Sequence, residues 1–303
     1  MKTKNIFLSL LCFLILSHAP SARADKKIKI VTTTSTFASI AKEIAGDKVE
    51  IYFIASPKRD IHFISPTPKD VMKLKSADVF IHAGLDLEAW RGPLLDVVGR
   101  TELMWPSGEK QIDASKGITL LEIPTSLSRA EGDIHLYGNP HYWMDPANGK
   151  IVAHNIAEGL ARLYPEDGDF FQKNDEAFGK KIDEKMKEWE RIASPHKDEP
   201  IVTYHKNWSY FAERFGFVVV GQLEPKPGIP PTPKHMAELI HLMKEKGVKV
   251  ILKESYQESR TPAKIAKETG AKVLLLAQSV EETKEASDYI SMIDYNIREL
   301  TRE

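Results

Sequence analysis

Three histidines and one glutamate fall at positions where the chain could bind a metal ion. His62 and His205 each follow an apolar run typical of a strand. His141 lies in a loop bounded by two prolines, and Glu254 ends a further apolar run. In open α/β sheets, ligands bind beyond the carboxyl ends of the strands. Three imidazoles and one carboxylate are a donor set that suits tetrahedral Zn²⁺.

The other histidines of the exported chain have simpler interpretations. We expect five of them to be exposed or hydrogen-bonded residues without a ligand: His82, His154, His196, His235 and His241. His135 lies in a polar loop six residues before His141, so it could be a surface residue or a ligand. From spacing alone, a three-histidine metal site and a set of unrelated loop histidines remain comparable alternatives.

Alternating strand and helix patterns must position these residues. Apolar runs predict strands at 28–34, 49–55, 77–84, 201–204, 217–223, 248–253 and 273–277, with weaker signals near Met104 and Ile118. Amphipathic periodicity predicts helices at 37–44, 70–75, 87–98, 146–163, 167–192, 208–215, 233–246, 262–269 and 281–300. This alternation is typical of parallel βαβ units.

The predicted fold is therefore α/β, with two Rossmann-like lobes, each a parallel sheet flanked by helices. One lobe is expected at 25–165 and the other at 195–303. A long rigid helix at 166–194 would join them, since about 25 residues span roughly 38 Å at 1.5 Å per residue. We expect the metal site in the cleft between the lobes.

The N-terminus has the pattern of an export signal. Two lysines precede an apolar run at 6–17, and Ala22 and Ala24 are small residues where signal peptidase reads the chain. The run is shorter than the about 20 residues that a bilayer span needs. We therefore expect a signal peptide at 1–24, cleavage after Ala24 and a periplasmic product.

Composition excludes several classes of protein. Lysine and arginine number 42 against 43 acidic residues, and this balance gives no basis for nucleic-acid binding. The single cysteine, Cys12, excludes a disulfide framework and a multi-thiolate metal site. Cys12 lies inside the apolar run rather than at its end, so we expect no lipid attachment. The sequence contains no phosphate-binding glycine loop, G-x-S-x-G elbow or H-E-x-x-H pattern.

From about Lys27 to the C-terminus, four ordered motifs resemble the solute-binding proteins of bacterial zinc and manganese ABC importers. The family patterns are D-P-H-x-Y-E-P-T-P with a following A-D, N-G-x-x-L-E-x-W, D-P-H-x-W-x-D-P and T-x-H-x-x-[FW]-x-Y-F. They are matched by Asp60, His62, Pro66, Thr67, Pro68, Ala77, Asp78, Gly84, Leu87, Glu88, Trp90, Pro140, His141, Trp143, Asp145, Pro146, Thr203, His205, Trp208, Tyr210 and Phe211. The resemblance implies that His62, His141 and His205 are metal ligands.

The sequence departs from the family pattern near the site. Ile61 and Ser65 replace a proline and an acid, and the histidine-rich loop of many zinc receptors is reduced to His135. Ala277 stands where many relatives carry a carboxylate ligand. Glu254 is then either the fourth ligand or a residue that positions a ligand. Water and Glu224 are the other candidates for the fourth ligand of the metal. Glu224 begins a proline-rich loop at 224–231, which we expect to form a cleft wall.

The leading functional prediction is a monomeric periplasmic receptor, not an enzyme, that captures a divalent transition metal and delivers it to an ABC permease. Zn²⁺ is favoured over Mn²⁺ because three imidazoles suit the softer ion. One alternative is a secreted zinc hydrolase, in which Glu254 would act as general base. Another is a receptor for an iron chelate, which would share the fold but need a wide cleft lined by aromatic or arginine residues.

Overall fold

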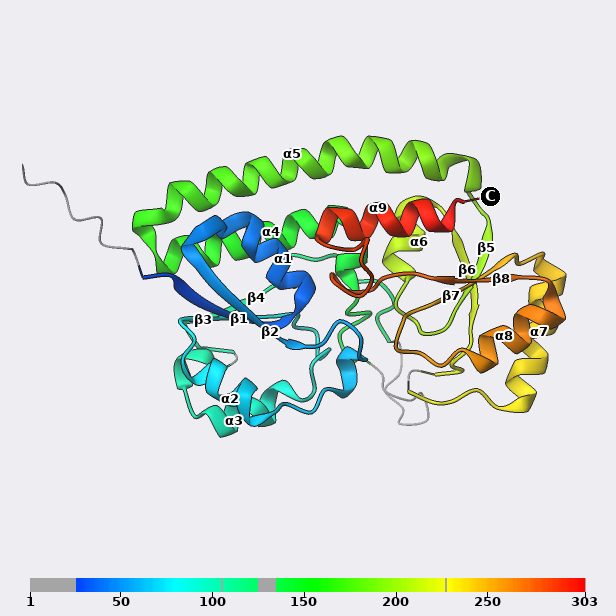
Figure 1. Ribbon diagram of the computed structural model, residues 1–303, viewed down its shortest axis with the longest axis horizontal. Coiled ribbons are helices and arrows are strands. Elements are labelled where there is room, and N and C mark those ends of the chain that lie inside the picture. The colour runs from blue at the N-terminus through cyan, green and yellow to red at the C-terminus, as the bar shows by residue number, and fades with distance from the viewer. Residues whose placement is uncertain (1–25, 105, 125–134, 227, 303) are drawn as a thin grey trace, which may run out of the picture.

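A computed structural model describes residues 26–104, 106–124, 135–226 and 228–302 of the chain. It contains two four-stranded parallel sheets, each flanked by helices, as predicted (Figure 1). The expected signal peptide lies outside the described residues. Within these residues, no helix combines the length and apolar character needed to cross a membrane.

Both sheets have the same strand order, in which the first strand of the lobe lies between the second and the third. The first sheet runs β2-β1-β3-β4, with β1 Ile28–Thr34, β2 Val49–Ala55, β3 Val79–His82 and β4 Gln111–Asp113. The second runs β6-β5-β7-β8, with β5 Pro200–Thr203, β6 Val218–Gln222, β7 Val250–Lys253 and β8 Lys272–Leu275. Because all strands of a sheet are parallel, their carboxyl ends share one edge, where ligands gather in such sheets.

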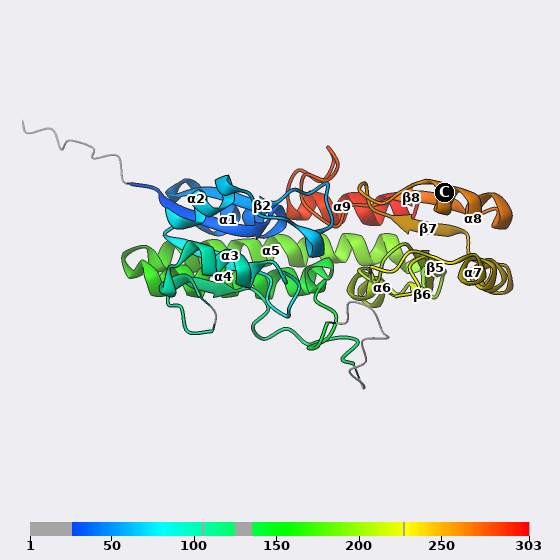
Figure 2. The ribbon, with the colours of Figure 1, turned by 90° about the horizontal axis from the view of Figure 1, so that it is seen from below.

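Helices cover the sheets and connect the lobes. Their bounds are α1 Ser35–Ala45, α2 Pro68–Lys75, α3 Arg91–Val98, α4 Pro146–Leu163, α5 Gly168–Ala193, α6 Ser209–Phe215, α7 Pro233–Lys246, α8 Arg260–Thr269 and α9 Tyr289–Leu300. The 26 residues of α5 extend about 39 Å at 1.5 Å per residue. In Figures 1 and 2, α5 runs beside both lobes, as the predicted linking helix does.

The weaker strand signals near Met104 and Ile118 do not correspond to strands, and the fourth strand of the first sheet lies elsewhere. No strand forms at Met104 or Ile118; β4 lies between them and pairs with β3 through Phe80, Ile81 and His82. Its three residues, Gln-Ile-Asp, bury only the isoleucine. A strand this short and polar has no apolar run to mark it, so its pairing depends on the neighbouring strand.

The last helix also begins later than predicted. Residues 281–288 are not helical, and α9 starts at Tyr289. The side chain of Asp288 accepts a hydrogen bond of 2.8 Å from the backbone N–H of Ser291 and caps the helix there. Glu281 has a φ of 67°, which breaks any helix through it.

One hydrophobic core runs through both lobes. It joins the first sheet and α1 to side chains of α5, α6 and α9, and it includes Leu252 and Leu276 of the second lobe. The segment between β8 and α9 contacts the first lobe directly. Ser35 donates a 2.6 Å hydrogen bond to the carbonyl of Val280, and the Tyr289 hydroxyl donates one of 2.6 Å to the carbonyl of Trp143. A second, smaller apolar cluster lies beneath α7 and α8.

Candidate metal centre

His62 is held by an aspartate two residues before it. After β2, the chain makes a single turn of 3-10 helix, Ile61–Phe63, whose N-cap residue is Asp60. One oxygen of Asp60 accepts hydrogen bonds from the backbone N–H of His62 at 2.9 Å and from its ring Nδ1 at 2.7 Å. The indole N–H of Trp90 donates to the carbonyl of Ile61 at 2.9 Å and fixes the turn from the other side.

His141 is held in the same way by Asn139. The side-chain oxygen of Asn139 accepts from the backbone N–H of His141 at 3.0 Å and from its Nδ1 at 2.9 Å. The amide nitrogen of Asn139 donates to the carbonyl of Lys206 and to the Glu122 carboxylate, which assigns the orientation of the amide. Asn139 therefore orients His141 and also ties its loop to the second lobe.

His205 leaves the carboxyl end of β5 and is oriented by an acid from the neighbouring strand's loop. Its Nδ1 lies 2.7 Å from an oxygen of Glu224, which follows β6. The backbone N–H of Glu224 donates to the carbonyl of Tyr204 at 3.0 Å. The hydroxyl of Thr203 donates to the carbonyl of His205 at 2.7 Å. Glu224, the first residue of the loop predicted to form a cleft wall, therefore contacts the site through His205.

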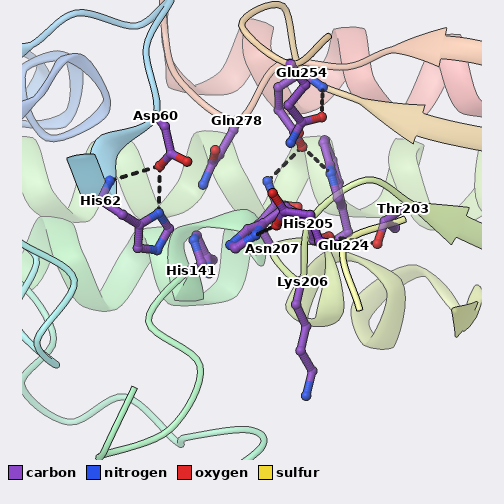
Figure 3. Close-up of polar contacts among 12 residues, drawn as sticks. Asp60, His62, His141, Thr203, His205, Lys206, Asn207, Glu224, Glu254 and Gln278 are labelled. Atoms are coloured by element: carbon purple, nitrogen blue, oxygen red, sulfur yellow. Dashed lines mark hydrogen bonds and ion pairs between the residues drawn. The ribbon is translucent and has the colours of Figure 1, made fainter. Parts of the chain in front are cut away.

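The three predicted histidines meet between the lobes. In the described part of the chain, His62, His141 and His205 form a group whose potential ligand atoms all lie within 4.8 Å of one another. Figure 3 shows them converging from the two lobes. Each Nδ1 is engaged by a protein oxygen, so each Nε2 carries the lone pair that could bind a metal. The Nε2 of His141 is buried and has no hydrogen-bond partner among the described residues.

The electrostatic surroundings keep two of these rings neutral and favour protonation of the third. Burial lowers the pKa of His62, although its hydrogen bond to Asp60 opposes the shift. Burial and the neighbouring imidazoles lower the pKa of His141 well below its usual value. Burial also disfavours the charged form of His205, but the hydrogen bond to Glu224 and the surrounding carboxylates outweigh it and raise the pKa. Neutral imidazole is the form that binds metals.

Glu254 lies at the carboxyl end of β7 and is fully buried. One of its oxygens accepts hydrogen bonds from Asn207 at 2.7 Å and from the Trp208 indole at 2.6 Å. Its other oxygen has no hydrogen-bond partner in the described part of the protein. Burial, reinforced by the charge of Glu282, raises the pKa of Glu254 to about 7. Glu254 is not part of the described three-histidine group.

A fourth imidazole, His135, touches the group from the loop before His141. Its Nε2 lies 3.1 Å from the Nε2 of His62, and its Nδ1 lies 3.0 Å from an oxygen of Asp86. Four other histidines make contacts elsewhere: His82 with Gln111, His154 with Asp175, His196 with Glu199 and His235 with the carbonyl of Gln222.

Sequence reasoning did not assign roles to the residues that orient the imidazoles. Asp60 and Asn139 could have been found, because each lies two residues before a histidine, a spacing at which an Asp or Asn side chain bonds its local backbone. The sequence predicts Glu224 as part of a cleft wall and a possible ligand, and it assigns no role to Asp86. Both are distant in sequence from their histidines, by 19 and 49 residues.

Two parallel-sheet lobes with a histidine cluster between them have the architecture of a two-lobed binding protein. The model of the ZnuA family, described as the periplasmic component A of a zinc-uptake complex, matches residues 30–303. The chain belongs to this family, as the ordered motifs predicted.

Individual relatives extend the comparison to other metals. The iron-binding protein YfeA of Yersinia pestis is 30% identical over 96% of this chain and 91% of its own length. The manganese ABC transporter substrate-binding lipoprotein PsaA of Streptococcus anginosus is 28% identical, with 96% and 94% covered. The crystal structure of ZnuA superposes with a TM-score of 0.78 at 24% identity, covering 91% of this chain and 98% of that chain. The names of these relatives therefore refer to more than one metal.

Proposed function

We propose that this protein is a periplasmic receptor that captures a divalent transition metal between its lobes and delivers it to an ABC permease. His62, His141 and His205 would be the ligands. The observation that carries the proposal is their convergence within 4.8 Å, with every Nδ1 already bound to an oxygen. Orienting hydrogen bonds of this kind are typical of metal-binding histidines.

Zn²⁺ is the metal that the donor set favours, with Mn²⁺ second. Imidazole suits zinc, whereas Mn²⁺ prefers carboxylate and carbonyl oxygens. The names of the relatives include zinc, manganese and iron, so they do not decide among these ions. We propose that Glu254 supports the site by holding Asn207 and Trp208, which lie directly after His205 and Lys206.

The receptor function is favoured over a zinc hydrolase or an iron-chelate receptor. The relatives named above bind metals or serve metal transport by name, and a cluster of three imidazoles, two of them on buried residues, matches a bare ion. We propose capture and release of the metal without chemical turnover. Export through the signal at 1–24 would place the receptor beside its permease.

Calorimetry of metal-free protein with Zn²⁺ tests the proposal. The wild-type protein should bind one ion with a dissociation constant below micromolar. His205→Ala should weaken binding by at least about 100-fold, since it removes the imidazole that the second lobe contributes. His154→Ala is the matched control, because this exposed histidine also pairs its Nδ1 with a carboxylate, at 2.9 Å, yet lies in α4 outside the three-histidine group.

Wild-type binding no tighter than micromolar for Zn²⁺, Mn²⁺ and Fe²⁺ would refute the proposal. Equal losses in His205→Ala and His154→Ala would refute the assigned ligand.

A further inference from the structure

The contact between His135 and His62 is not explained by a hydrogen bond between two neutral rings. Their Nε2 atoms are 3.1 Å apart, which is hydrogen-bond distance, and their ring centroids are 5.1 Å apart. Each ring also presents its Nδ1 to a carboxylate, Asp60 for His62 and Asp86 for His135. A carboxylate without a proton can only accept a hydrogen bond, so each Nδ1 must carry the ring's hydrogen.

The two facing nitrogens therefore both carry lone pairs when the rings are neutral. Neither can donate to the other, so the 3.1 Å contact brings together two electron-rich atoms. A cation that both nitrogens bind removes this conflict. Two nitrogens bound at about 2.0 Å to one tetrahedral zinc ion lie roughly 3.3 Å apart, close to the separation observed here.

Asp86 fixes His135 by two contacts. One oxygen meets the ring Nδ1 at 3.0 Å, and the other accepts the backbone N–H of Leu136 at 2.9 Å. Asp86 and the preceding Leu85 have φ values of 57° and 53°, a conformation that costs energy for residues other than glycine. The turn after β3 is therefore strained at Asp86, the residue whose carboxylate orients His135.

The side chain of His135 is also largely withdrawn from solvent, with 15% of its surface exposed. Its ring centroid is 6.1 Å from that of His141, compared with 5.1–5.4 Å between the rings of His62, His141 and His205. His135 therefore stands at the edge of the three-histidine group and reaches it through His62. A short approach of its ring would complete four-coordination.

We propose that His135 is the fourth ligand, so that the cargo ion is bound by four imidazoles. This inference rests on the proposed function and specifies its coordination. A site with four imidazoles and no carboxylate selects borderline ions such as Zn²⁺ over Mn²⁺, which prefers oxygen donors. Asp86 is then the residue that positions this fourth ligand, as Asp60, Asn139 and Glu224 position the other three.

X-ray absorption of the zinc-loaded full chain tests this assignment directly, because imidazole rings give a countable outer-shell signal. The wild-type protein and the His154→Ala control should each show four imidazoles. His135→Ala should show three imidazoles and one oxygen, with zinc affinity lowered by about 100-fold. Asp86→Ala, which leaves the imidazole in place, should lower affinity by about 10- to 100-fold through loss of its orienting partner. His135→Ala should also narrow the preference for Zn²⁺ over Mn²⁺ by at least about tenfold.

Three imidazoles in the wild-type protein, with an unchanged spectrum in His135→Ala, would overturn the inference while leaving the receptor function standing. An oxygen ligand that disappears in Glu254→Gln would overturn it in favour of Glu254. Absence of tight binding in the wild-type protein would instead defeat the proposed function.

Discussion

Acidification should weaken metal binding mainly through one of the three histidines on which the proposed function rests. Metal and proton compete for the same imidazole nitrogen, so affinity falls below the pKa of each ligand in the metal-free protein. The pKa of His205 is raised, whereas those of His62 and His141 are lowered. As pH falls, His205 therefore takes up its proton first.

The size of this effect follows from the direction of the shifts. Below its pKa, each ligand costs about one decade of affinity per pH unit, and an unperturbed histidine titrates near 6.5. His205 alone should then reduce zinc affinity by at least about 1.5 decades, or 30-fold, between pH 7.5 and pH 5. His62 and His141 should each add less than this, because their depressed pKa values delay protonation.

Two matched variants test whether His205, whose pKa is raised, contributes more to the pH dependence of binding than His62, whose pKa is lowered. Glu224→Gln removes the carboxylate that raises the pKa of His205, so its affinity should depend less on pH than that of the wild type. Asp60→Asn makes the same change beside His62, and it should reduce the pH dependence less than Glu224→Gln does, because Asp60 contributes less than Glu224 to the raised pKa of His205. At pH 7.5, both variants should lose about 10- to 100-fold in affinity, since each removes an orienting acceptor.

Competition with a chelator of known proton affinity, at half-unit steps from pH 5 to pH 8, would measure these constants. The reasoning fails if wild-type affinity is constant over this range. It also fails if Glu224→Gln and Asp60→Asn change the pH dependence equally.

Two further predictions concern the metal-free protein and can be measured by urea denaturation. Gly149→Ala should lower the free energy of unfolding by about 1–3 kcal/mol, because a Cβ there would overlap the buried hydroxyl and ring of Tyr289. Its control is Gly179→Ala, whose Cβ would meet only the side chain of Lys150 at 3.8 Å and which should not destabilise the protein. Glu254 has a pKa of about 7 against 4.5 in the unfolded chain, so the folded state retains its proton longer and stability falls by about 3 kcal/mol as pH rises through this interval. Glu254→Gln should remove that loss, and parallel pH profiles for the two proteins would contradict the assigned burial.

The sequence predicted the strands that carry the histidines better than the hydrogen bonds that orient their rings. Strands β1 and β2 and the positions of His62 and His205 after strands followed from apolar runs, because buried parallel strands carry such runs regardless of what surrounds them. The convergence of His62 with His205 followed from a general rule about strand ends rather than from any local signal.

What could not be predicted depends on contacts distant in sequence. The pairing of Glu224 with His205 requires two adjacent strands to end at the same level, which no local pattern specifies. The pairing of Asp86 with His135 requires a turn with two left-handed residues, Leu85 and Asp86, which sequence propensity disfavours. Such departures from local preference are expected at functional sites.

The shared core limits how the lobes can respond to the metal. Trp189 of α5 donates a 3.1 Å hydrogen bond to Asp294 of α9, and the Trp143 indole donates one of 2.9 Å to the carbonyl of Gln278. The buried contact between Trp143 and Gln278 joins the lobes through protein groups, and a large hinge motion would have to break it. At the site, the side-chain amide of Asn139 in the first lobe donates a hydrogen bond to the carbonyl of Lys206 in the second lobe. This contact connects the two lobes beside His141. Metal binding should therefore stabilise the existing arrangement, and most of the structural change on release should occur in the loops that bear the histidines.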